Sequence, residues 1–324
     1  LKKILEAIYE PRFLNCMYGF RPNRGCHDAI KELYKRLNNT KICYIVDADI
    51  KGFFDHMKHE WIIKFLNLYI KDPNIIGLVK KYLKVGVLDG GELMMNEEGS
   101  AQGNIISPIL ANIYMHNVLT LWYKFIITKE CKGDNFLIVY ADDFVAGFQY
   151  KWEAENYYKL LKERMEKFGL QLEESKSHLL QSGAYIARAK QKSGESTRLE
   201  TFDFLGFTFY CGRSRKGMPY IMPKTSSKKF RQKIRDIKVW LYANRDQSLK
   251  KLMGMLNLKL VGHYRYYGIS FNGRMISNYK QQVRELLFKV LNRRSDRKSY
   301  TREGFIEMLK YYPLALPKIY VSLF

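Results

Sequence analysis

Two aspartates lie between two apolar runs in the stretch Phe136-Leu137-Ile138-Val139-Tyr140-Ala141-Asp142-Asp143-Phe144-Val145-Ala146-Gly147-Phe148. Both runs are rich in aromatic and aliphatic residues, as strands are, and only Ala141, Asp142 and Asp143 separate them. Such a short connection predicts a β-hairpin with the two acids at its turn. Aspartate is common in turns because its side chain hydrogen-bonds nearby backbone, so the pair alone does not establish a site.

A second apolar run, from Lys41 to Ile50, also ends in acids, Asp47 and Asp49. Buried strands that carry Asp49, Asp142 and Asp143 to one edge of a sheet are electrostatically costly unless cations neutralise the charge. Mg²⁺ prefers such hard oxygen ligands and keeps positions open for water and phosphate. Two such ions, about 3.5–4 Å apart, stabilise the attacking and leaving oxygens of a phosphoryl transfer. The acids therefore predict two-metal chemistry on a phosphate substrate.

The charge of the chain points to a polyanionic partner. The 324 residues include 55 Lys+Arg and 32 Asp+Glu, and the segment from Lys224 to the end holds 23 of the former and 6 of the latter. A net charge of +17 in this segment is expected of a nucleic-acid binder. An anionic membrane surface is the weaker alternative, because the basic residues do not gather on one amphipathic helix face. No stretch approaches the roughly 20 apolar residues that span a bilayer.

The length of the chain and the change to basic helical segments after Ser226 predict two domains, residues 1–223 and 224–324. Helical spacing marks residues 29–37, 61–70, 108–121 and 152–168 in the first. Strands are expected at 41–50, 170–172 and 202–210, with a polar, mobile stretch at 181–200. After Ser226, three helical segments carry apolar faces built around residues 230–241, 249–260 and 279–290. These segments predict a basic helical bundle.

The five cysteines are scattered, with no Cys-x-x-Cys pair and no histidine at zinc-ligand spacing. We expect them to be thiols in a reducing cytoplasm. The sequence begins at Leu1 within a predicted helix, and its first residues do not have the pattern of a signal peptide. We expect an upstream segment.

The residues alone do not distinguish a nuclease from a polymerase. A resemblance to a known family gives further information. Tyr140-Ala141-Asp142-Asp143 looks like the catalytic signature of reverse transcriptases. Four further stretches resemble sequence blocks of the group II intron reverse transcriptases, and they occur in the family's order. They are residues 18–29 (Tyr-Gly-Phe-Arg-Pro-Asn-Arg-Gly-Cys-His-Asp-Ala), 47–55 (Asp-Ala-Asp-Ile-Lys-Gly-Phe-Phe-Asp), 102–108 (Gln-Gly-Asn-Ile-Ile-Ser-Pro) and 204–207 (Phe-Leu-Gly-Phe). The basic bundle resembles their thumb, the maturase X domain. The resemblance covers essentially the whole chain.

The resemblance implies an α+β right-hand polymerase fold. An antiparallel palm sheet and helical fingers, lacking their first part, would occupy residues 1–223, and a basic helical-bundle thumb residues 224–324. The implied activity is RNA-directed DNA polymerisation, in which a primer 3′-hydroxyl attacks the α-phosphate of a dNTP. The implied partners are an RNA template, a DNA primer, dNTPs and group II intron RNA. The implied cofactor is a pair of Mg²⁺ ions, for which Mn²⁺ can substitute.

By the same resemblance, Asp49, Asp142 and Asp143 are the catalytic residues and bind the metals, together with the backbone carbonyl of Ile50. The residues expected to contact the nucleotide are Phe54 (the steric gate against a 2′-hydroxyl), Arg21, Gln102, Gly103 and Lys176. Asp47 is expected to be a supporting acid and Asp55 a helix cap.

Two kinds of alternative stay open at this point, a binding protein and a different enzyme. The chain could be chiefly an RNA-binding splicing maturase with secondary or no polymerase activity. It could also be an RNA-dependent RNA polymerase or a metal nuclease, although a ring as large as that of Phe54 speaks against use of rNTPs.

Overall fold

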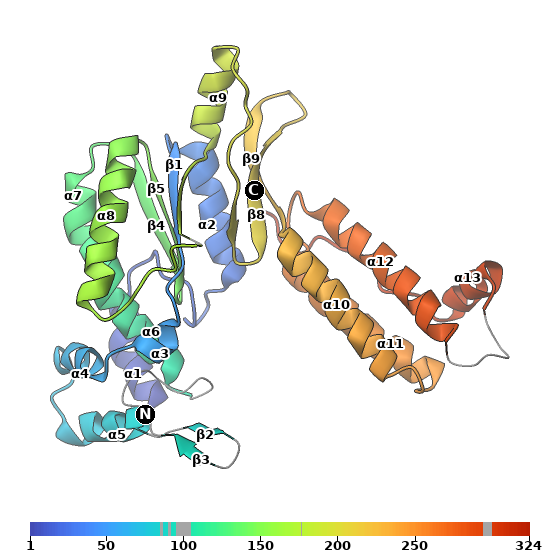
Figure 1. The fold of residues 1–324 in the computed structure, drawn as a ribbon, viewed down its shortest axis with the longest axis horizontal. Coiled ribbons are helices and arrows are strands. Elements are labelled where there is room, and N and C mark those ends of the chain that lie inside the picture. Colours follow the sequence, from blue (N-terminus) through green and yellow to red (C-terminus); the bar gives the residue numbers. More distant parts are fainter. Residues whose placement is uncertain (85–86, 90–91, 95–104, 176, 294–299) are drawn as a thin grey trace. The chain divides into compact units, whose positions relative to one another are not determined.

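The computed structural model describes residues 1–84, 87–89, 92–94, 105–175, 177–293 and 300–324 (Figure 1). They form two compact units. The first comprises Leu1–Leu205 and Cys211–Ile221, and the second Gly206–Tyr210 and Met222–Phe324. The predicted α+β class is confirmed, because antiparallel sheets occur together with many helices.

The first unit is built on a four-stranded sheet with the order β4-β5-β1-β6. Its strands are β1 (Tyr44–Ala48), β4 (Asn135–Tyr140), β5 (Asp143–Phe148) and β6 (His178–Gln181), and all neighbours are antiparallel. The predicted hairpin is confirmed as β4 and β5. Tyr140 pairs with Asp143, so that only Ala141 and Asp142 form the loop.

Helices cover both faces of this sheet (Figure 1). Helix α8 (Lys151–Lys167) packs on one face, where Val46, Phe144 and Phe148 join the main hydrophobic core. Helix α2 (Cys26–Asn39) lies on the other face. Because side chains alternate along a strand, odd-numbered residues of β1 and β5 face away from the main core. Asp47, Asp49 and Asp143 therefore belong to the α2 face.

The other elements of the first unit surround this layer. They are α1 (Lys2–Tyr9), η1 (Glu10–Arg12), α3 (Phe53–His56), α4 (His59–Asn67), α5 (Pro73–Lys84), β2 (Val87–Asp89), β3 (Glu92–Met94), α6 (Ser107–Met115), η2 (His116–Thr120), η3 (Tyr123–Ile127), α7 (Thr128–Glu130), α9 (Ala184–Lys192) and β7 (Phe202–Phe204). Strands β2 and β3 pair with each other.

Three expectations differ from the structure. The stretch at 181–200, expected to be mobile, contains helix α9. The strand expected at 202–210 is interrupted by a turn, in which Leu205 and Gly206 both have positive φ, and resumes as β8 (Phe207–Arg213). The strand expected at 170–172 is reduced to a single bridge between Ile50 and Leu172. Backbone conformations at a turn depend on neighbouring elements, which a local pattern does not contain.

The second unit consists mainly of helices α10 (Ser227–Ala243), α11 (Leu249–Tyr267), α12 (Gly273–Leu291) and α13 (Arg302–Tyr311). The three predicted helical segments are confirmed as α10, α11 and α12, and each contributes apolar residues to the buried interior of the unit. Side-chain oxygens of Ser226, Ser248 and Thr301 cap the first turns of α10, α11 and α13. Strands β8 and β9 (Pro219–Thr225) contribute residues to both units, and the chain last crosses between the units at Ile221–Met222.

Candidate functional site

The structure brings the three predicted catalytic aspartates to one end of the sheet. The β1–β5 ladder ends with Ala48 opposite Phe144, so Asp49 and Asp143 are the next residues on the two strands. Asp142 is in the hairpin loop beside them. All three side chains are half-buried. This end of the sheet is called the carboxylate edge below.

The backbone of Ile50 is oriented toward the same edge. The Asp49 carbonyl accepts a hydrogen bond from the Glu173 amide at 2.8 Å, and the Lys51 amide donates to the Gln171 carbonyl at 2.9 Å. Successive residues of a strand direct their backbone groups to opposite sides. The Ile50 carbonyl therefore points away from Gln171 and Glu173, to the side on which β5 lies.

Burial and like charges dominate the electrostatics of the carboxylate edge. Burial raises the pKa of Asp142 above its ordinary value, and the charge of Asp49 raises it further. The pKa of Asp47 rises to about 8, first through burial and then through the charges of Asp143, Asp203 and Asp49. Mutual repulsion of this kind favours the binding of a cation between the carboxylates.

The carboxylates and the Ile50 carbonyl suit a divalent ion whose remaining ligands are water and substrate phosphate. Within the described residues, no three carboxylate, imidazole or thiol side chains are arranged to enclose a metal ion by themselves. Mg²⁺ is usually held in nucleotide enzymes by one or two carboxylates, with water and substrate phosphate as the remaining ligands. Carboxylates carried on adjacent strands, with a carbonyl beside them, fit that kind of site.

Two neighbouring rings, Phe53 and Phe54, begin helix α3, and the structure distinguishes them. Phe53 is 2% exposed and packs edge-on against Tyr114 in the core, with ring centroids 6.2 Å apart. Phe54 is half-buried and contacts Phe53 edge-on at 5.4 Å. Phe54 is therefore the ring of the two that retains exposed surface, as a ring in contact with a substrate must.

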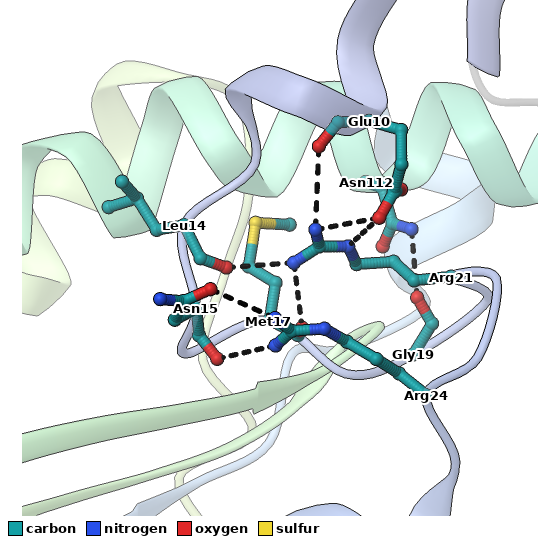
Figure 2. A network of polar contacts seen from close by, with 8 residues as sticks. All are labelled: Glu10, Leu14, Asn15, Met17, Gly19, Arg21, Arg24 and Asn112. Atoms are coloured by element: carbon teal, nitrogen blue, oxygen red, sulfur yellow. Dashed lines mark hydrogen bonds and ion pairs between the residues drawn. The ribbon is translucent and has the colours of Figure 1, made fainter. Parts of the chain in front are cut away.

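Arg21 takes part in a network of polar contacts within the first unit (Figure 2). Its Nε and Nη2 atoms contact Glu10 Oε1 at 2.8 and 2.7 Å, and Nη1 donates to the carbonyls of Leu14 and Met17. A longer bond from Nη2 reaches the Glu10 carbonyl at 3.4 Å. All five guanidinium N–H donors are thus directed into the protein. Arg21 thus anchors this loop, and its contact with the incoming nucleotide stays a prediction.

Gly19 and Asn112 were not predicted as site residues, yet both support the carboxylate edge. A Cβ atom on Gly19 would lie 2.4 Å from the Ala141 nitrogen, so only glycine lets this loop contact the hairpin turn. The Asn112 side chain donates to the Gly19 carbonyl at 2.8 Å, as Figure 2 shows. Ala141 has a φ of +57°, which is uncommon for alanine. The approach of Gly19 to the hairpin turn could not be predicted, because a contact between distant backbone segments produces no periodic pattern in the sequence. The presence of a glycine in this loop was the available signal.

Three predicted nucleotide contacts, Gln102, Gly103 and Lys176, lie outside the described residues. Asp55 is exposed, and its amide donates to the Gly52 carbonyl at the start of α3. No helix in the described part of the chain has the length and apolar character needed to cross a membrane.

Comparison with known proteins agrees with this geometry. Residues 1–209 match the family model described as reverse transcriptase (RNA-dependent DNA polymerase). The chain belongs to the reverse transcriptase family, as its motifs indicated. Residues 227–306 match the model described as group II intron, maturase-specific domain. The particular combination is therefore that of the group II intron-encoded reverse transcriptases.

Individual relatives match over shorter stretches. The group II intron-encoded protein LtrA of Lactococcus lactis subsp. cremoris is 40% identical over 131 residues, which are 40% of this chain and 21% of that protein. An uncharacterised 91 kDa protein in the cob intron of Schizosaccharomyces pombe is 42% identical over 119 residues, 36% of this chain and 14% of that protein. Apo telomerase from Candida tropicalis aligns over 96% of this chain and 52% of its own, with 14% identity and a TM-score of 0.49.

Proposed function

We propose that this chain is an RNA-directed DNA polymerase. The observation that carries the proposal is the meeting of Asp49, Asp142 and Asp143 at one end of the sheet of a reverse transcriptase. In the proposed reaction the primer 3′-oxygen forms a bond to the α-phosphorus of a dNTP. The bond from that phosphorus to the β-phosphate breaks, pyrophosphate leaves, and the hydroxyl proton is lost to the surroundings. The template is RNA and the primer is DNA.

We assign Asp49, Asp142, Asp143 and the Ile50 carbonyl as ligands of two divalent ions. Reverse transcriptases generally use divalent metals, and we propose Mg²⁺ here, with Mn²⁺ as a substitute. When bound, such ions neutralise the charge that develops on the transferring phosphate. The protein's part is to hold the carboxylates on buried strands, so that little reorganisation is needed during the reaction. The contact of Gly19 with the turn supports the same rigidity.

Phe54 is proposed as the group that selects the sugar. Its half-buried ring is large enough to exclude a 2′-hydroxyl if the ribose lies beside it. Gln102, Gly103 and Lys176 are proposed as further contacts of the incoming nucleotide, on the family resemblance alone. Residues 1–223 are proposed as fingers and palm, and residues 224–324 as the thumb.

The basic second unit is proposed to hold the template–primer duplex through its phosphates. Contacts of this type depend strongly on salt and little on sequence. Raising the salt concentration should therefore weaken duplex binding steeply, with little difference between duplexes of different sequence.

Primer extension tests the proposal most directly. The assay uses an RNA template, a DNA primer, dNTPs and Mg²⁺, and compares the wild type with Asp142→Asn, which removes a charge but preserves shape. Asp134→Asn is the matched control, because Asp134 lies at the opposite, exposed end of the same hairpin. We expect activity in the wild type and the control and its loss in Asp142→Asn. A fully active Asp142→Asn variant would refute the assignment.

We propose a maturase role as a second function, and the match of residues 227–306 to the maturase-specific domain favours it. The proposed partner is a group II intron RNA. Folding an RNA needs binding but no phosphoryl transfer by the protein. A splicing assay on a cognate intron RNA should therefore give the same rate with wild type and Asp142→Asn. Loss of splicing in that variant would argue against an independent maturase role.

The proposed setting is the reducing cytoplasm. Burial raises the pKa of Cys16, Cys43 and Cys131 to about 11, so these thiols stay protonated and poorly reactive at neutral pH.

A further inference from the structure

The second unit contains a hollow that the proposed polymerase reaction does not use. It lies among helices α10, α11 and α12 and has a volume of about 540 Å³. Residues that line it include Lys233, Asp236, Lys259, Gly262, His263 and Tyr266. Pockets for small ligands have volumes of roughly 300–1,000 Å³. The hollow is therefore large enough for one nucleotide.

His263 is the buried polar group of this hollow. It is 8% exposed, and its Nε2 atom has no hydrogen-bond partner among the described residues. Its ring is stacked on Tyr279, with centroids 3.6 Å apart and planes 10° apart. Burial, and then the charge of Lys233, lower the pKa of His263 to about 3, so the ring is neutral at physiological pH. A buried nitrogen without a partner costs free energy, which a ligand with a matching polar group would recover.

Charged and aromatic groups line the hollow together with His263. Lys233 and Lys259 supply positive charge from α10 and α11. Asp236 accepts a hydrogen bond from Gln232 at 2.7 Å, and its other oxygen is 3.8 Å from the Lys233 ammonium. Tyr266 is half-buried and is stacked with Phe207 at 5.9 Å. Aromatic surface, a polar edge and nearby cations together match a base and its phosphate.

We propose that this hollow binds one unstacked nucleotide of a single-stranded RNA, with the base at His263 and Tyr266 and the phosphate toward Lys233 and Lys259. The inference rests on the proposed function, since it names what the second unit recognises besides a duplex. A free nucleotide offers the same chemistry. An RNA strand is favoured because the segment from Lys224 onward carries a net charge of +17, far more than one nucleotide requires.

Two glycines of helix α11 allow a matched test. Gly262 lines the hollow, and a Cβ atom there would meet nothing within 4 Å, so a larger side chain can extend into open space. Gly254 has the same freedom on the same helix but does not line the hollow. Leucine at either position improves helix propensity. Gly262→Leu should therefore fold and obstruct the site, and Gly254→Leu should fold and leave it open.

The measurement is fluorescence anisotropy with the full chain and labelled RNAs. The probes are single-stranded hexaadenylate, single-stranded hexauridylate and a blunt 12-base-pair RNA duplex. For the hexamer that binds more tightly, we expect Gly262→Leu to weaken affinity about tenfold, the scale of one lost base contact. Duplex affinity should change less than twofold, and Gly254→Leu should match the wild type with all probes. Melting curves confirm that both variants are folded.

Several results would overturn the inference. They are unchanged hexamer binding by folded Gly262→Leu, equal weakening of hexamer and duplex, or equal effects of both leucine variants. Competition by adenosine or uridine monophosphate at lower concentration than the hexamer would point to a free nucleotide instead.

Primer extension by the wild type is scored separately. If primer extension is active but hexamer affinity is the same in Gly262→Leu and the wild type, the proposed nucleotide site is refuted and the polymerase proposal stands. An inactive protein with binding that depends on position 262 would refute the polymerase alone.

Discussion

Two polar clusters of the first unit, one around Arg21 and one at the carboxylate edge, differ in how their charges are arranged. Around Arg21, a single positive charge meets a carboxylate and three backbone carbonyls, and every donor has a partner. At the carboxylate edge, burial and neighbouring carboxylate charges raise the pKa of Asp47 and Asp142. A cluster whose donors all have partners holds structure, whereas carboxylates whose charges raise the pKa of a neighbouring acid favour the binding of a cation.

The two clusters are physically connected through the loop at residues 14–21. Arg21 and Arg24 hold the carbonyls of Leu14, Asn15 and Met17, and the next turn of the loop brings Gly19 against Ala141. Strand β4 also bonds this loop, because the Tyr18 amide donates to the Val139 carbonyl at 2.8 Å. The Arg21 cluster thus holds the loop that contacts the hairpin turn of Asp142.

The largest expected effect separates activity from stability at the carboxylate edge. Asp143→Asn should lower the primer-extension rate by roughly 10³-fold, or about 4 kcal/mol in barrier height. Its melting temperature without metal should be unchanged or higher, because one repelling charge is gone. Single-turnover kinetics and thermal melting measure both. A marked loss of stability together with activity would mean that the carboxylate is structural.

The Arg21 cluster should behave in the opposite way. Arg21→Met leaves the Glu10 carboxylate and the loop carbonyls without their donor, which should reduce the free energy of unfolding by about 3–5 kcal/mol. Arg24→Met is the control in the same loop, since Arg24 is only half-buried and bonds Asn15 and the Met17 carbonyl. It should cost about 1 kcal/mol. Urea titration measures both, and equal losses would contradict the distinction.

Gly19→Ala tests the connection between the clusters. The added methyl group would meet the Ala141 nitrogen at 2.4 Å, so the turn must move. A displacement of the catalytic groups by about 1 Å can cost roughly 10²-fold in rate, and we expect a loss of that order in kcat. Gly25→Ala is the control, because its Cβ would come no closer than 3.8 Å to Asp28. Full activity in Gly19→Ala would show that the turn tolerates the shift.

Phe54→Val should change selectivity more than rate. If the ring excludes the 2′-hydroxyl, the preference for dNTP over rNTP in kcat/KM should fall about tenfold to a hundredfold. Phe53→Leu is the contrasting variant, since its ring is buried beside Tyr114 and should affect stability instead. Unchanged sugar discrimination in Phe54→Val would refute the gate.

The smallest effect concerns a buried polar group in the second unit. Burial lowers the pKa of His263 to about 3, so the unfolded chain binds a proton that the folded chain rejects below pH 6.5. Stability should therefore fall by about 1 kcal/mol between pH 6.5 and 5.5 through this group. His263→Phe should remove that part of the pH dependence in urea titrations, and an unchanged slope would contradict it. His116, with a pKa lowered to about 4 by burial and by the charge of Arg21, should retain its own contribution.

The chain's local patterns were sufficient for the hairpin, the helices α10 to α12 and the family. Apolar runs around Asp142 and helical spacing after Ser226 depend on residues close together in the sequence, and burial of apolar side chains acts on such patterns directly. The identity of Asp49, Asp142 and Asp143 as one group could also be inferred, because adjacent strands end at a common edge.

The tertiary structure was needed for the roles that depend on which atoms meet across long separations. Arg21 stands in a motif that implies a nucleotide contact, and only the structure shows that the Glu10 side chain and the carbonyls of Leu14 and Met17 accept hydrogen bonds from it. Phe53 and Phe54 are identical in sequence terms, and only packing against Tyr114 distinguishes them. Gly19 matters because its backbone lies against Ala141. His263 matters because its buried Nε2 atom has no hydrogen-bond partner among the described residues. The physical reason is the same in each case: a residue's type sets which interactions it can make, whereas folding determines which of them are satisfied.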